Sequence, residues 1–247
     1  MVKKSKTAPL ATQLRGVCAL FSGGKDSTYA VHWALMHGFD VKCLVTLIPA
    51  REDSWMFHRP AVEYTKLQAE AMGLRQILEK TSGVRGVELV DLRRALNKAI
   101  DECGVSGVVT GALLSDYQRM NINMVAEELG LRVYSPLWRK DQARYLLELY
   151  DAGLRFMITS IDAYGLDPGL MGRVLGRNDL ERVVKLASTH GFNPAFEGGE
   201  AETFVVDAPL FRSRVGVRGR VVRLSEYSWR FIIDEAWLEP KPNEAAG

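Results

Sequence analysis

The stretch Phe21-Ser22-Gly23-Gly24-Lys25-Asp26-Ser27 decides how the first part of this 247-residue chain folds. It ends the apolar run Val17–Phe21, which is typical of a buried parallel strand, and it opens a helical pattern over residues 26–37. Two adjacent glycines allow a tight turn, and the N-terminus of the following helix adds a partial positive charge. With one lysine and two serine hydroxyls, the stretch predicts a phosphate-binding loop.

Spacing separates this loop from two widespread phosphate loops. A Walker A loop needs glycine six residues before Lys25, where this chain has Ala19, and it needs Ser or Thr in place of Asp26. A dinucleotide-binding loop needs the pattern G-x-G-x-x-G, which this stretch does not have. The plainer reading is a Gly-Gly turn with a solvated lysine and a helix cap. The strand before it and the helix after it favour a phosphate loop.

The rest of the first half alternates strand-like and helical patterns, which predicts a parallel sheet with right-handed crossovers. Strands are expected at Val41–Leu47 and Gly107–Thr110, and helices at Pro60–Met72, around Leu89–Ile100 and at Ser115–Leu129 with Ser115 as its N-cap. The fold class is therefore α/β with a doubly wound parallel sheet. In such a sheet, ligands bind at the carboxyl ends of the strands.

The pattern changes after Ser135-Pro136-Leu137-Trp138, which predicts a second, smaller α+β domain. Its elements are a helix at Gln142–Ala152 capped by Asp141, a helix opened by a capping box at Asn178–Glu181, and strands at Phe156–Ile161, Thr203–Asp207, Val215–Leu224 and Phe231–Trp237. We expect a nucleotide-binding domain over 14–138 and a substrate-binding domain over 139–240. Flexible tails are expected over 1–13 and 241–247.

Composition excludes several classes of protein. Hydrophobic residues make up 47% and charged residues 25%, an ordinary globular balance, and a formal net charge of +2 gives no strong nucleic-acid footprint. Three cysteines without a C-x-x-C pair disfavour a disulfide framework and a structural zinc site. No apolar run approaches the ~18 residues of a membrane span, and Met1–Leu10 lacks the apolar core of a signal peptide. We expect a cytoplasmic protein that binds neither membrane nor DNA, and an oligomer is compatible with the sequence.

Two stretches follow predicted strands. Asp53-Ser54-Trp55-Met56-Phe57-His58 follows the second strand, and its aromatic side chains either grip a ligand or pack onto the domain. Gly111-Ala112-Leu113-Leu114-Ser115-Asp116-Tyr117-Gln118-Arg119 follows the strand at 107–110. Its polar side chains either serve a nucleotide or substrate, or simply form a helix N-terminus whose dipole favours Asp116.

The stretch Glu197-Gly198-Gly199-Glu200-Ala201-Glu202-Thr203 is the most informative part of the second half. If the chain is extended from Glu200, then Glu200 and Glu202 lie on one face, roughly 7 Å apart. Carboxylates at that range raise each other's pKa unless a cation is bound. A metal, ammonium or a substituted amine would fit. A solvated acidic turn is the plainer reading.

Together these stretches resemble the diphthine–ammonia ligase family, whose phosphate loop is that of the ATP pyrophosphatases. The resemblance also covers Gln68-Ala69-Glu70-Ala71-Met72-Gly73 and Pro136-Leu137-Trp138, so it spans most of the chain. It implies a HUP-like fold of the adenine nucleotide alpha hydrolase type, with ATP and Mg²⁺ as cofactors. The partners it implies are ammonium and translation elongation factor 2 bearing diphthine, a modified histidine. The diphthine carboxylate is adenylated with loss of pyrophosphate, and ammonium then displaces AMP to give diphthamide.

The resemblance also implies roles for single residues. ATP is expected at Ser22, Gly23, Gly24, Lys25, Asp26, Ser27, Gly111, Ser115, Gln118 and Arg119, with Asp26 the candidate for contact with Mg²⁺ through MgATP. Diphthine is expected at Trp55, His58 and Tyr117, because its trimethylammonium suits an aromatic face such as that of Trp55. Glu197, Glu200 and Glu202 are expected to be catalytic. Of these, Glu200 or Glu202 is expected to take a proton from ammonium.

The chain departs from the family pattern at three positions. Phe196 stands where the family often has glycine, and Asn121 and Asn123 stand where it tends to have Arg and Glu. These departures leave room for a non-catalytic, nucleotide-binding regulatory module. A third hypothesis is an enzyme that modifies tRNA, such as a nucleobase thiolase. RNA would then meet the basic residues Arg212, Arg214, Arg218, Arg220, Arg223 and Arg230, whereas Cys18 and Cys43 look like buried small hydrophobes rather than a catalytic pair.

Overall fold

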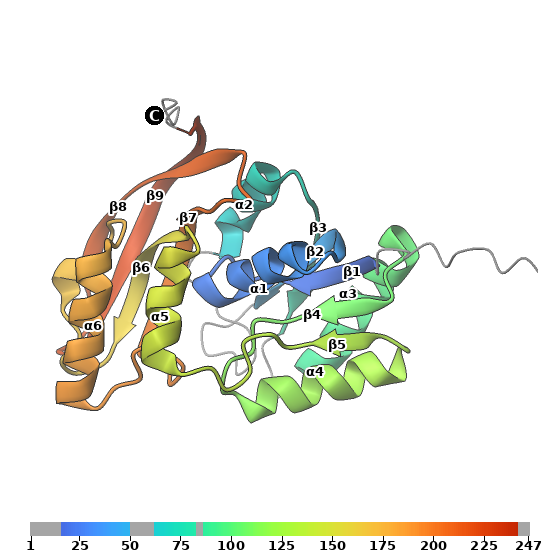
Figure 1. Ribbon diagram of the computed structural model, residues 1–247, viewed down its shortest axis with the longest axis horizontal. Coiled ribbons are helices and arrows are strands. Elements are labelled where there is room, and N and C mark those ends of the chain that lie inside the picture. The colour runs from blue at the N-terminus through green and yellow to red at the C-terminus, as the bar shows by residue number, and fades with distance from the viewer. Residues whose placement is uncertain (1–15, 50–61, 83–85, 242–247) are drawn as a thin grey trace, which may run out of the picture.

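The computed structural model describes residues 16–49, 62–82 and 86–241, which form two sheets with helices packed on them (Figure 1). The first sheet has five parallel strands in the order β3-β2-β1-β4-β5, and the second has four strands in the order β7-β6-β9-β8, paired antiparallel. This arrangement confirms the α/β class with a doubly wound sheet and a second, smaller α+β part. The predicted stretch at 53–58 lies outside the described residues.

The first sheet has helices on both of its faces. Its strands are β1 (Gly16–Leu20), β2 (Asp40–Pro49), β3 (Arg75–Thr81), β4 (Gly107–Val109) and β5 (Arg132–Tyr134), and its helices are α1 (Lys25–Met36), α2 (Thr65–Met72), α3 (Val87–Cys103) and α4 (Asp116–Glu128). Successive side chains of a strand point to opposite faces. Ala19 packs into the core shared with α1, whereas Cys18 packs into the core under α3 and α4. Burial raises the pKa of the Cys18 thiol to about 12, in line with a small hydrophobe rather than a nucleophile.

The strands that sequence patterns did not reveal, β3 and β5, are the two edges of this sheet. Within β3 only Ile77 and Thr81 are buried, and β5 has no fully buried residue, so neither carries the apolar run of a central strand. The helix predicted over 60–72 is also different in detail. A 3₁₀ turn, η1 (Val62–Tyr64), leads into α2.

The second half follows its predicted order, with one correction at a helix start. Its elements are α5 (Gln142–Asp151), β6 (Arg155–Asp162), the 3₁₀ turn η2 (Pro168–Leu170), α6 (Arg177–His190), β7 (Ala201–Asp207), β8 (Ser213–Arg223) and β9 (Ser228–Pro240). Asp141 caps α5 as predicted, because its Oδ1 accepts from the Arg144 N–H at 2.9 Å. The capping box predicted at 178–181 is wrong. Gly176 is the cap, and its N–H donates to Asp179 at 2.8 Å.

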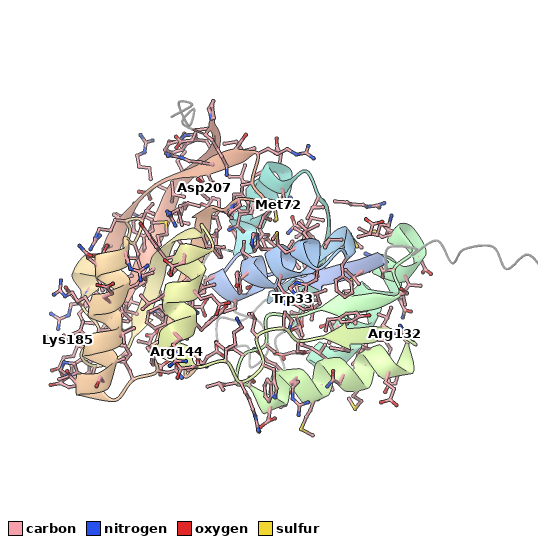
Figure 2. All side chains as sticks on the ribbon, viewed as in Figure 1. Trp33, Met72, Arg132, Arg144, Lys185 and Asp207 are labelled. Carbon is pink, nitrogen blue, oxygen red and sulfur yellow. The ribbon has the colours of Figure 1, made fainter. Side chains whose placement is uncertain are left out.

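The two halves share one apolar core. Helix α1 lies between the first sheet and the second half, and α5 and α6 cover the second sheet (Figure 1). Ala30 and Val31 of α1 belong to the same buried cluster as Leu146 of α5 and Phe204 of β7. Figure 2 shows side chains filling the space between the ribbons, with Arg144 and Lys185 on the surface of α5 and α6. Because β7 runs beside the start of α1, its residues can reach the loop after β1. Within the described ranges, no helix is long and apolar enough to cross a membrane.

Candidate active site

The predicted phosphate loop joins β1 to α1 and turns on its two glycines. Gly23 has a left-handed backbone with φ of 80°, and a Cβ at this position would lie 2.3 Å from Gln68 Oε1. Gly24 is extended and precedes the first residue of α1. The hydroxyl of Ser27 accepts from the Ser22 N–H at 3.2 Å and donates to the Gly24 carbonyl at 3.2 Å. The loop therefore needs glycine for both its conformation and its close approach to α2.

The edge of the second sheet holds this loop in place. The Gly23 carbonyl accepts from the Val205 N–H at 3.0 Å and from Gln68 Nε2 at 2.9 Å. The same Gln68 amide donates to the Val205 carbonyl at 2.7 Å, and the Lys25 N–H donates to Thr203 Oγ1 at 3.1 Å. Strand β7 is an outer strand of its sheet, so its free edge is paired with the loop instead of with another strand. The glutamate stretch that leads into β7 is thus brought beside the phosphate loop.

Of the two charged side chains of the loop, Lys25 is almost fully enclosed and Asp26 is partly exposed. Lys25 is only 3% exposed, and its Nζ lies 2.9 Å from Asp26 Oδ2 and 5.4 Å above the ring of Phe196. The second oxygen of Asp26 accepts from the hydroxyl of Tyr145 at 2.9 Å. A buried cation at a helix N-terminus is suited to a polyanion.

Phe196 adopts a backbone conformation that favours glycine. Its φ is 67°, in the left-handed region, which costs an L-residue roughly 1–2 kcal/mol. A glycine at this position would adopt the same conformation without that cost. Here the ring is buried and lies against the Lys25 ammonium, so the departure adds a cation–π contact to the loop.

Glu197 faces the loop from the start of the glutamate stretch. Its Oε2 accepts from the Leu114 N–H at 3.2 Å, which ties it to the segment after β4. Burial, and after it the negative charge of Asp26, raise the pKa of the Glu197 carboxyl to about 7, although Lys25 acts in the opposite direction. Glu197 therefore exchanges a proton near neutral pH, as a general acid or base must.

The other two glutamates are placed differently. Strand β7 begins at Ala201, two residues before the predicted Thr203, and Glu200 lies in the bend that precedes it. Its carboxylate turns back on its own loop and accepts from the N–H groups of Asn193 and Gly198, each at 2.8 Å. Glu202 is half-buried in β7, and its N–H donates to Ser160 Oγ at 3.2 Å. In the part of the chain that the structure describes, no cluster of three or more acid, His or Cys side chains is suited to a metal ion.

Gly111 lets the end of β4 touch the phosphate loop. A Cβ at Gly111 would lie 2.7 Å from the Asp26 carbonyl carbon and 2.8 Å from the Ser27 nitrogen. This close approach brings the predicted third stretch to the loop, as expected for the carboxyl ends of neighbouring parallel strands.

The remaining residues of that stretch lie in different surroundings. Ser115 is the N-cap of α4 as predicted, and its hydroxyl accepts from the Gln118 N–H at 3.2 Å. The guanidinium of Arg119 stacks on the indole of Trp138 at 4.5 Å. Arg139, which sequence reasoning missed, lies 5.6 Å from the same ring. Tyr117 packs against the core under α3 and α4, and the departures Asn121 and Asn123 are half-buried on α4.

The donors gathered here fit a nucleotide phosphate. The loop offers a buried ammonium, hydroxyl groups, a glycine turn and a helix N-terminus, and Asp26 supplies a hard carboxylate oxygen of the kind that Mg²⁺ prefers. The fold and this site define an α/β protein in which a loop suited to phosphate joins the first strand to the first helix.

Comparisons with known proteins give the family. Residues 15–133 match the model of the diphthamide synthase N-terminal domain, and residues 141–237 match that of the diphthamide synthase C-terminal domain. The chain belongs to the diphthamide synthase family.

Several relatives carry the same functional description. The chain is 35% identical over 217 residues to a diphthine–ammonia ligase of Danio rerio, covering 81% of this chain and 85% of the relative. It is 33% identical over 221 residues to that of Homo sapiens, covering 81% of each. A solved structure of a predicted subunit of tRNA methyltransferase from Methanocaldococcus jannaschii is similar at 14% identity and a TM-score of 0.38, over 79% of this chain and 100% of that chain. A structural similarity this low gives no information about the activity of this chain.

Proposed function

We propose that this protein is a diphthine–ammonia ligase, which uses ATP and ammonium to amidate diphthine on translation elongation factor 2. The observation that carries the proposal is the pairing of β7 with the phosphate loop, through Val205 and Gly23 at 3.0 Å. This pairing sets a carboxyl of raised pKa, that of Glu197, beside a loop suited to pyrophosphate. An enzyme that first adenylates a carboxylate and then aminates it needs both groups in one site.

In this proposal the loop holds the leaving pyrophosphate. Lys25 and the N-terminus of α1 neutralise charge that builds up on the departing oxygens, the exposed Ser22 hydroxyl is available as a donor, and the Ser27 hydroxyl holds the loop in shape. Bound Mg²⁺, for which Asp26 is the candidate ligand, would supply further neutralisation of that charge. Gly111 and Arg119 would border the nucleotide from the third stretch. Trp55, His58 and Tyr117 remain our candidates for diphthine.

Glu197 is the best-supported proton acceptor for ammonium. An ammonium ion that gives a proton to the Glu197 carboxylate becomes ammonia, whose lone pair attacks the acyl carbon of the adenylate. The new C–N bond forms as the C–O bond to AMP breaks, AMP leaves with that electron pair, and the nitrogen gives its one surplus proton to solvent to leave the neutral amide. The expectation that Glu200 or Glu202 takes the proton stays a prediction. Glu200 already uses both oxygens to hold its own turn, which supports Glu197 instead.

The experiment is an analysis of nucleotide products. The protein is incubated with ATP, Mg²⁺, ammonium and elongation factor 2 bearing diphthine. We expect AMP and pyrophosphate in amounts equal to the diphthamide formed, and none without the protein substrate. ADP, or intact ATP despite measurable binding, would overturn the proposal. Intact ATP would favour a regulatory module.

Two further expectations remain part of this proposal. We place the domain boundary at 138/139, shortly before Asp141, which caps α5. We propose a cytoplasmic location, because the described thiols Cys18, Cys43 and Cys103 are free and two of them are fully buried.

A further inference from the structure

We propose that Tyr145 is a positioning residue for the phosphate loop, because its hydroxyl orients the Asp26 carboxylate that holds Lys25. The inference rests on the proposed function, since it assigns Tyr145 to the pyrophosphate subsite of that reaction. Tyr145 is not part of the loop. It comes from α5 in the second half, 119 residues after Asp26 along the chain.

The Asp26 carboxylate is held at both of its oxygens. Oδ1 accepts from the Tyr145 hydroxyl at 2.9 Å, and Oδ2 accepts from Lys25 Nζ at 2.9 Å. Tyr145 is fully buried. Its phenolic O–H is the donor of this hydrogen bond, because a carboxylate only accepts. With one oxygen fixed in this way, the other faces the lysine.

Tyr145 is itself fixed by its neighbours. The ring of Tyr29 on α1 lies 5.9 Å from its ring, and Lys140 Nζ lies 5.8 Å from it and 5.5 Å from the ring of Tyr29. Glu148 accepts from the Tyr29 hydroxyl at 2.5 Å and also pairs with Lys140. The two tyrosines thus form neighbouring hydroxyl–carboxylate pairs, but only the pair of Tyr145 and Asp26 includes a residue of the phosphate loop.

Such fixing matters for a lysine, whose side chain has much rotational freedom to lose on binding a ligand. A lysine already held in the bound orientation loses less freedom when phosphate arrives, so binding is tighter. Removal of the Tyr145 hydroxyl leaves the ring in place and frees the Asp26 carboxylate to turn. The loss should therefore fall on the phosphate end of the nucleotide and spare the nucleoside end.

The test compares Tyr145→Phe with Tyr29→Phe in the full chain. Each variant removes one phenolic hydroxyl that donates to a carboxylate, so the two are matched in chemistry and nearly matched in place. Calorimetry gives the affinities for magnesium pyrophosphate and for adenosine, and thermal melting checks the fold. We expect Tyr145→Phe to weaken pyrophosphate binding about ten-fold, as for loss of one hydrogen bond to a charged group. Adenosine affinity should stay unchanged, and Tyr29→Phe should alter neither.

Three comparisons between the proteins would overturn the inference. These are equal pyrophosphate affinity in Tyr145→Phe and the unaltered protein, equal losses in the two variants, and a parallel loss of adenosine binding. Failure of pyrophosphate to bind the unaltered protein would overturn it as well. Failure of the proposed function is recognised separately, because the unaltered protein would then bind pyrophosphate yet form no AMP with diphthine-bearing elongation factor 2.

Discussion

The phosphate loop, residues 21–27, and the glutamate turn, residues 193–202, are adjacent polar turns that are stabilised in opposite ways. The loop is held by residues from elsewhere in the chain, namely Gln68, Val205 and Tyr145. The turn is held largely from within, because the Glu200 carboxylate accepts hydrogen bonds from two backbone N–H groups of the same turn. Glu200 stabilises the turn, whereas Glu197 faces the phosphate loop and has a raised pKa. Acidic residues of one motif therefore have different roles.

Glu197→Gln should have the largest effect on activity. Glutamine keeps the shape and can still accept from the Leu114 N–H, but it cannot take up a proton. We expect diphthamide formation to fall about 10²-fold or more, as for loss of a general base. In the unaltered protein, the rate should rise with pH through about 7, the pKa of Glu197, and this limb should disappear in the variant. Rates over a series of pH values with saturating ATP test both expectations. A fully active variant would leave Glu200 or Glu202 as the base.

The same variant should be more stable than the unaltered protein at high pH. The folded-state pKa of Glu197 is raised from 4.5 to about 7, so the folded state loses stability as pH rises between these values. Glutamine does not ionise and avoids this loss. The difference in Tm between the variant and the unaltered protein should therefore be larger at pH 8 than at pH 5. An equal difference at both values would show that the carboxyl is not perturbed.

Gly111→Ala tests whether the phosphate loop depends on close packing from outside. The new methyl group would lie within 2.9 Å of the Asp26 and Ser27 backbone, so the start of α1 must shift. We expect the free energy of unfolding to fall by roughly 1–3 kcal/mol, with a loss of ATP affinity. Gly16→Ala is the control, because its methyl group would meet nothing closer than 3.5 Å in the same sheet. Denaturant unfolding and ATP titration measure the two effects, and equal behaviour of the two variants would contradict the packing role.

Sequence patterns revealed the loop and the central strands because their signals are local. The Gly-Gly turn, the lysine and the buried run of β1 all lie within a dozen residues of one another. The contacts that complete the site are not local. Gln68 meets Val205 across 137 residues, and Tyr145 on α5 reads only as a core position of an amphipathic helix. No spacing rule distinguishes such a tyrosine from any other buried residue of the core, so its hydrogen bond to Asp26 is seen only in the folded structure.

The glutamate turn shows the same limit in another form. Alternation would place Glu200 and Glu202 on one face only if the chain were extended from Glu200, but strand β7 begins at Ala201. The side chain of Glu200 accepts hydrogen bonds from N–H groups of its own turn. Residue type and spacing alone do not predict these hydrogen bonds. The raised pKa of Glu197 depends on burial and on Asp26, which are properties of the folded chain.

Glu200→Ala tests whether the glutamate turn is held from within. Two N–H groups lose their acceptor, and we expect a loss of roughly 1–3 kcal/mol in the free energy of unfolding. Glu200→Gln should lose less, because its carbonyl oxygen can still accept one of the two hydrogen bonds. Chemical denaturation of both variants measures this order. If Glu200→Ala kept full stability while amide formation ceased, Glu200 would be a catalytic group rather than the support of the turn.

The smallest effects are expected far from both turns, on the hairpin of β8 and β9. Arg214, Arg218 and Arg220 pair there with acidic residues of β9, so the basic stretch is largely neutralised across the two strands. Exposed pairs of this kind contribute roughly 0.2–1 kcal/mol. Arg218→Ala combined with Arg220→Ala should thus barely change the unfolding free energy or the rate of amide formation.

This double variant also separates the ligase from an enzyme that acts on tRNA. Arginines that bind phosphates of RNA give an affinity that falls steeply with salt, whereas arginines already paired with carboxylates release few counterions. We expect tRNA binding by the unaltered protein to be weak and to change little when these two arginines are removed. Tight, salt-dependent tRNA binding that the double variant abolishes would instead make the hairpin an RNA-binding surface. The phosphate loop and the glutamate turn would then serve a nucleobase, and the division of roles between them would have to be tested again on that substrate.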